Sequence, residues 1–269
     1  MPTYLNILFF FSFIFTTSCQ TRKLNAIVDL PSSLKEVSAV ETIKSSNLIW
    51  VIEDAGNKNN LYAIGNDGSL SKTIEIENAQ NIDWEDLTSD RDGNLYIGDF
   101  GNNARRRTDF SIYKIKQPAS GSLSMKAEII TFELPKKTKS EDFESFFILN
   151  NTFYIFSKNN KKTKLFRIPN ETGHHVATYI SEVKLKEKRS KVTAADISDD
   201  GKTVILLNHE RLWSLTNFTE DNFFNGKITA MSFDHNSQKE GVNFYDDATV
   251  LVTDEKNKHS GGKLYMLKL

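Results

Sequence analysis

The sequence predicts an all-β fold, a β-propeller of five four-stranded blades, and two observations lead to this prediction. The first is an internal repeat: a short segment at the start of a predicted strand recurs with its middle residue at positions 38, 85, 144, 193 and 240. The intervals between these positions are 47, 59, 49 and 47 residues. A period near 50 residues built from strands is typical of a propeller, in which each repeat forms one blade. The second is that a strand missing from the last repeat is present before the first one.

Each of the first four repeats contains strand-length segments whose residues are alternately or continuously apolar, as expected for strands packed between neighbouring blades. Hairpin signals lie where the pattern requires them, at Asp67-Gly68, Asp92-Gly93 and Asp200-Gly201. The predicted strands are 37–42, 48–53, 60–65 and 71–76 in blade one; 87–88, 95–99, 110–115 and 127–133 in blade two; 146–149, 153–157, 164–168 and 177–183 in blade three; and 192–197, 203–208, 211–215 and 227–233 in blade four.

Blade five has only three predicted strands, 241–244, 249–253 and 263–267. We expect the segment 24–30 to supply its fourth strand, because closure by the N-terminal strand removes the open edge of the ring. Because the strand that blade five lacks is available at the N-terminal end, we favour five blades over the alternative of six.

The first 15 residues are apolar and rich in phenylalanine, and they run into Thr16-Thr17-Ser18-Cys19, where Cys19 is the single cysteine of the chain. This pattern predicts a bacterial lipoprotein signal peptide at 1–18, a lipidated tether at 19–23 and one propeller domain at 24–269. The apolar core is shorter than the roughly 20 residues that span a bilayer. An ordinary secretory peptide is the alternative.

The predicted location is the cell envelope, with Cys19 acylated and the propeller held at a membrane by its lipid. Because residues 20–23 contain no acidic run, we favour an outer-membrane anchor that faces the periplasm. The formal net charge of −1 gives the chain no overall field that would recruit nucleic acid. We expect a monomer.

Two motifs carry a family resemblance: Asp83-Trp84-Glu85-Asp86-Leu87, and the segment from Tyr96 to Asn103 that reads YIGDFGNN. With them the chain resembles a group of secreted bacterial propellers akin to the SdiA-regulated family and, more distantly, to NHL-type propellers. The resemblance implies a propeller associated with calcium, without a settled biochemical role.

Acidic residues recur at two positions of the repeat that a propeller brings to the same mouth of its channel. The inward positions are Ser38, Glu85, Glu144, Thr193 and Glu240, and the loop positions are Asp54, Asp99, Lys158, His209 and Asp254. Clustered carboxylates repel one another, and a calcium ion, which takes about 6 to 8 oxygen ligands, would relieve this repulsion. The predicted metal ligands are Glu85, Asp99, Glu144, Glu240, Asp54 and Asp254. The alternative is that these acids bond to backbone amides of the next blade and hold the ring together.

The function predicted from these positions is that of a binding or interaction module for a small-molecule or protein ligand at the channel mouth. The candidate ligand-binding residues are Asn102, Asn103, Arg105, Arg106, Lys158 and His209. A metal-dependent hydrolase of phosphoesters or lactones is the first alternative, and a purely structural envelope protein is the second. The chain has no HExxH zinc motif and no G-x-S-x-G nucleophile elbow, and the sequence leaves open whether it is an enzyme.

Overall fold

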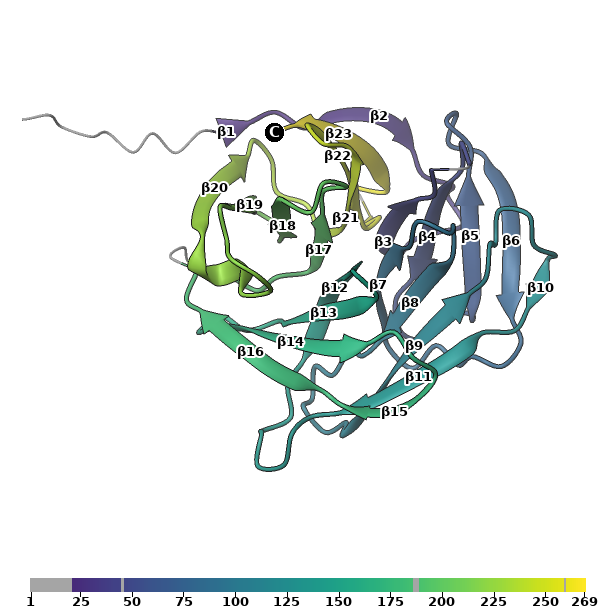
Figure 1. Ribbon diagram of the computed structural model, residues 1–269. Coiled ribbons are helices and arrows are strands. Elements are labelled where there is room, and N and C mark those ends of the chain that lie inside the picture. Colours follow the sequence, from purple (N-terminus) through teal and green to yellow (C-terminus); the bar gives the residue numbers. More distant parts are fainter. Residues whose placement is uncertain (1–20, 45, 186–188, 259) are drawn as a thin grey trace, which may run out of the picture.

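The computed structural model describes residues 21–44, 46–185, 189–258 and 260–269, and it is a five-bladed β-propeller (Figure 1). The prediction of five blades is confirmed. Cys19 and the predicted signal peptide lie outside the described residues. In blade one, running from the channel outward, the strands are β3 (Val37–Thr42), β4 (Ile49–Glu53), β5 (Asn60–Ile64) and β6 (Leu70–Ile76).

The other blades repeat this antiparallel order. Blade two contains β7 (Trp84–Ser89), β8 (Leu95–Asp99), β9 (Asp109–Ile115) and β11 (Glu128–Glu133). Blade three contains β12 (Phe143–Leu149), β13 (Thr152–Ser157), β14 (Thr163–Pro169) and β16 (Thr178–Val183). Blade four contains β17 (Ala194–Ile197), β18 (Thr203–Leu207), β19 (Arg211–Thr216) and β20 (Lys227–Phe233). Blade five contains β21 (Lys239–Asp246), β22 (Thr249–Asp254), β23 (Lys263–Lys268) and β2 (Asn25–Asp29).

The N-terminal strand closes the ring as predicted. β2 pairs antiparallel with β23, and it is the outermost strand of blade five (Figure 1). Leu24 and Leu30, which flank β2, are each 5% exposed, and they pack into the hydrophobic clusters on the two sides of blade five. The last blade is therefore built from both ends of the described chain.

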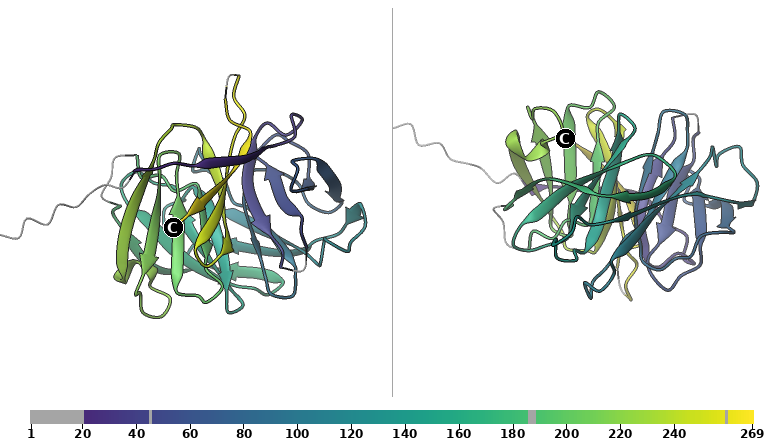
Figure 2. Two further views of the ribbon diagram at one scale, coloured as in Figure 1. Left: turned by 90° about the horizontal axis from the view of Figure 1, so that it is seen from above. Right: turned by 60° about the horizontal axis from the view of Figure 1, so that its bottom comes forward.

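Three short strands were not expected, and all of them add to the outside of a blade in parallel orientation. β1 (Thr21–Arg22) pairs with β20, β10 (Ser124–Met125) with β6, and β15 (Gly173–Val176) with β11. Each lies just before the outermost strand of one blade and covers the edge of the blade before it (Figure 1). In the left view of Figure 2, the purple N-terminal segment passes from the green blade four to the yellow blade five in this way. Thr21 and Arg22, which the sequence analysis assigned to the tether, are thus paired with blade four.

The core consists of apolar clusters between neighbouring blades, which is why most strands read as apolar on both faces. Between blades two and three the cluster is rich in phenylalanine, and the rings of Phe110 and Phe143 meet edge to face with centroids 5.3 Å apart. Within the described residues, no helix is long and apolar enough to cross a membrane.

Candidate cation site at the channel mouth

A β-bulge lies in the innermost strand of four blades, at the position that the sequence repeat aligned. The pairing register shifts between Val37 and Ala39, Trp84 and Asp86, Phe143 and Ser145, and Lys239 and Gly241. The extra residues are therefore Ser38, Glu85, Glu144 and Glu240. A bulge redirects the side chain of its extra residue. It also interrupts strand alternation, which explains why β7 and β12 begin three residues earlier than predicted.

The strand register shows that the loop positions aligned in the sequence do not all occupy the same place in their blades. Asp99 pairs with Trp84 and Asp254 with Lys239, and the residue that pairs in the same way in blade one is Glu53, opposite Val37. Asp54 is one residue farther along. Its counterparts in the other blades are therefore Phe100, Lys158, His209 and Glu255.

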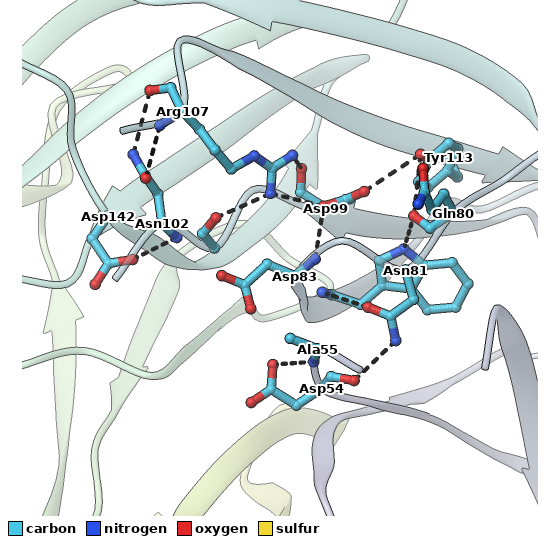
Figure 3. A network of polar contacts seen from close by, with 12 residues as sticks. Asp54, Ala55, Gln80, Asn81, Asp83, Asp99, Asn102, Arg107, Tyr113 and Asp142 are labelled. Carbon is cyan, nitrogen blue, oxygen red and sulfur yellow. Dashed lines mark hydrogen bonds and ion pairs between the residues drawn. The ribbon is translucent and has the colours of Figure 1, made fainter. Parts of the chain in front are cut away.

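Asp99 and Asp254 are consequently held inside their own blades. The carboxylate of Asp99 is fully buried, accepts a hydrogen bond from Arg107 at 2.9 Å, and lies 3.4 Å from the hydroxyl of Tyr113 on β9 (Figure 3). Asp254, also fully buried, accepts a hydrogen bond from the hydroxyl of Tyr265 on β23 at 2.8 Å. The structure does not bring these two predicted ligands into the group of acids at the mouth.

Three other carboxylates do come together at the mouth. One oxygen each of Asp54, Asp83 and Glu85 lie within 4.8 Å of one another. Burial raises the pKa of Asp83 to about 7, with a further contribution from the charge of Asp54. Burial also raises the pKa of Glu85 well above its usual range, and the charges of Asp54 and Asp83 add to this shift. Asp83 was not among the predicted ligands, although it is the first residue of the DWEDL motif.

Gly101 explains the glycine of the second motif. A Cβ atom at this position would lie 2.1 Å from Oε1 of Glu85 and 2.4 Å from Oδ2 of Asp83. Any side chain there would displace the two carboxylates. The GDFGNN motif therefore leaves space for the acids of the DWEDL motif. Gly98 makes room in the same way for the ring of Phe100, which would lie 2.1 Å from a Cβ atom.

A second group of acids extends the negative side of the mouth toward blade five. Burial raises the pKa of Glu255 to about 7, and the charges of Glu240, Asp54 and Glu36 contribute to the shift. Blades five, one and two therefore all contribute carboxylates to this side. The sequence analysis did not assign Glu255 to the mouth, because it aligned the loop positions with a shift of one residue.

Blades three and four contribute basic side chains to the mouth. Lys158 forms an ion pair with the buried Glu144, and Nε2 of His209 lies 2.8 Å from Oε1 of Glu240. Beside these pairs lies a cavity of about 390 Å³, whose lining includes Lys158, Arg189, Lys191, His209 and several amide side chains. Two of the predicted ligand-binding residues, Lys158 and His209, thus line a cavity next to the acids.

The predicted ligand-binding residues of the loop after β8 have other surroundings. The amide of Asn102 is used within the protein: Nδ2 donates to the backbone oxygen of Glu141, and Oδ1 accepts from the backbone N–H groups of Arg106 and Arg107. Asn102 therefore joins blades two and three and has no oxygen to spare for a metal. Asn103, Arg105 and Arg106 are exposed and do not line the cavity.

Carboxylates also join blades directly, as the structural alternative proposed, but they are different residues. Oδ2 of Asp86 accepts hydrogen bonds from the backbone N–H of Phe146 in blade three and of Ala195 in blade four, at 3.0 and 3.4 Å. Asp196 accepts one from the backbone N–H of Phe244 in blade five at 2.6 Å. These buried acids hold the innermost strands of neighbouring blades together.

No family model matches the chain, and no curated protein does so. Solved structures show the fold. The chain is similar to a gluconolactonase from Xanthomonas campestris (TM-score 0.51, 91% of this chain and 89% of that chain covered) and to an aldose sugar dehydrogenase from Streptomyces coelicolor in its PQQ-bound form (TM-score 0.53, 91% and 97%). It is also similar to a chain of a nidogen/laminin complex (TM-score 0.51, 82% and 72%). Sequence identity is 9% in every case, so these likenesses concern the propeller fold alone. The resemblance to the SdiA-regulated family stays a prediction.

Proposed function

We propose that this protein is a ligand-binding propeller that holds a calcium ion with Asp54, Asp83 and Glu85 and binds a small molecule or protein at the same channel mouth. It is a monomer, anchored by a lipid on Cys19 to the outer membrane and facing the periplasm. The observation that carries the metal site is the approach of three carboxylates from blades one and two to within 4.8 Å of one another.

The donor chemistry supports calcium in particular. All three groups offer carboxylate oxygens, which are the ligands that hard cations prefer. Their raised pKa values reflect an arrangement in which negative charge is held close together and out of water. A divalent cation would remove this unfavourable interaction, and the absence of a Cβ atom at Gly101 gives the carboxylates of Asp83 and Glu85 the space to remain together.

The test is the calcium dependence of thermal unfolding. Saturating a site at about 100 times its dissociation constant adds roughly 2.7 kcal/mol to the free energy of unfolding, so EDTA should lower the melting temperature and calcium should restore it. Glu85→Gln and Gly101→Ala should each abolish the difference. Ala55→Gly, at the position in blade one equivalent to Gly101, and Glu75→Gln, an exposed acid on β6, should keep it. Identical melting curves in calcium and in EDTA would reject the metal site.

A metal-dependent hydrolase is the second candidate, and one observation favours it. The cavity that Lys158 and Lys191 line is adjacent to the acids, so an anionic group bound there would lie near the cation. Turnover of a generic phosphoester or lactone, dependent on calcium and lost in Glu85→Gln, would establish catalysis. Calcium-dependent stability without such turnover would favour the binding module.

A further inference from the structure

We propose a second metal site, for zinc or a similar transition metal, on the outer part of blade two, formed by Asp109, Glu133 and His174. One ring nitrogen of His174 and one carboxylate oxygen of each acid lie within 4.8 Å of one another. The three residues come from β9, β11 and β15, so the site would connect blade two to the segment of blade three that covers its edge (Figure 1). This proposal is independent of the calcium site at the mouth.

The strand register explains why these side chains meet. Glu133 pairs directly with Asp109, and Thr131 pairs with His174 on the other side of β11. Residues 131 and 133 lie on the same face of the sheet because side chains alternate along a strand. His174 is thus the diagonal neighbour of Glu133, within reach of a long side chain. β15, a strand that the sequence did not predict, brings the histidine to this position.

Hydrogen bonds orient the imidazole of His174 as they do in metal sites. Oγ1 of Thr131 lies 3.1 Å from Nδ1 of His174 and donates a hydrogen bond to the backbone oxygen of Gly173 at 3.3 Å. A hydroxyl has a single hydrogen, so when Thr131 donates it to Gly173, its oxygen is free to accept from an Nδ1–H group of His174. In that tautomer Nε2 carries the lone pair that a metal needs. A metal-bound histidine typically donates its other N–H group in this way.

The charges point to a cation. Like charges that lie directly opposite on neighbouring strands destabilise a sheet, and Asp109 and Glu133 form such a pair. Oδ2 of Asp109 also accepts a hydrogen bond from the hydroxyl of Thr108 at 2.9 Å, which orients this carboxylate. A divalent ion between the two carboxylates and the imidazole would convert the repulsion into attraction.

The donor set distinguishes this site from the one at the mouth. Two carboxylate oxygens and one imidazole nitrogen suit zinc, which accepts both donor types and would keep a fourth position for water. Calcium prefers sites made of oxygen alone, as at Asp54, Asp83 and Glu85. The zinc ion would fasten β15 to blade two at the edge of the sheet.

The experiment measures zinc binding to the full chain, without any affinity tag, by competition with a chromophoric chelator. We expect one equivalent of zinc to bind, and His174→Ala and Glu133→Gln to weaken this binding at least tenfold. His175→Ala, on the same strand but the other face, and Glu75→Gln, an exposed acid on β6, should leave it unchanged. Substitution by cobalt should give visible absorption bands in the wild type and not in His174→Ala.

Circular dichroism and melting in EDTA check that the variants are folded. Folded His174→Ala protein that binds zinc as tightly as the wild type would overturn the proposal. So would the absence of zinc binding at micromolar concentrations in the wild type.

Discussion

The carboxylate of Asp99 accepts a hydrogen bond from the backbone N–H of Asp83 at 3.1 Å (Figure 3). Asp99 is the last residue of β8, and Asp83 immediately precedes β7, so this bond fixes the start of the innermost strand of blade two. The same carboxylate is paired with Arg107. A buried ion pair within the blade therefore supports the position of a carboxylate at the mouth, and removing it should disturb both stability and the proposed calcium site.

Arg107→Met should destabilise the protein strongly. Arg107 donates hydrogen bonds to Oδ1 of Asp99 and to the backbone oxygens of Gly101 and Asp99, and without it a fully buried carboxylate loses its ionic partner. Breaking one side of a buried pair typically costs about 3–5 kcal/mol. Urea unfolding provides the measurement, and Arg106→Met, which removes a neighbouring exposed arginine, should change the free energy of unfolding by less than about 0.5 kcal/mol.

Closure of the ring by β2 can be tested with two substitutions of similar chemistry. Leu24→Ala should lower the free energy of unfolding by about 2–5 kcal/mol, because Leu24 is buried between blades four and five. Ile27→Ala should have a much smaller effect, because Ile27 lies on the same segment but is 48% exposed. A truncated chain that begins at Pro31 should melt at a lower temperature still. Equal melting of the truncated and complete domains would mean that β2 does not close the ring in solution.

Stability in EDTA should depend on pH through the acids at the mouth. The pKa of Asp83 is about 7 in the folded protein, compared with 3.8 for an unperturbed side chain. Between these values the folded state binds more protons than the unfolded state, so the free energy of unfolding should fall as pH rises from about 4 to about 7. Asp83→Asn should make this decline shallower, whereas Glu75→Gln should not. Adding calcium to the wild type should offset the loss at pH 7 and above. A free energy of unfolding that rises over this range would contradict the pKa assignment.

Lipidation of Cys19 is tested by metabolic labelling with a fatty acid in a bacterial host. The wild-type chain should incorporate the label, and the Cys19→Ser chain should not, because the thiol is the acceptor of the lipid. Fractionation of the same cells should find the wild type with the outer membrane. Equal labelling of the two chains would exclude Cys19 as the lipid acceptor and favour the ordinary secretory peptide.

The sequence alone was sufficient to determine the number of blades and the way in which the ring closes. Both depend on local patterns, since each strand has its own apolar periodicity and each hairpin its own turn residues, such as Asp92-Gly93. The aligned positions 38, 85, 144 and 240 also proved to have a common structural meaning, because each is the extra residue of a β-bulge. When each repeat has the same backbone geometry, equivalent positions have equivalent surroundings. This holds even where the side chains differ chemically, as those of Ser38 and Glu85 do.

The tertiary structure decided which acids meet. Asp54 and Asp99 look equivalent in the sequence, but the strand register separates them by one residue, and one residue along a chain is enough to turn a side chain from the mouth into the blade. Asp83 could be assigned to the cluster only once blades one and two were packed together. The parallel pairs formed by β1, β10 and β15 depend on contacts between distant segments, and strands of two to four residues carry no periodicity of their own. Local patterns thus fix the blades, whereas the sites depend on long-range packing that no single segment encodes.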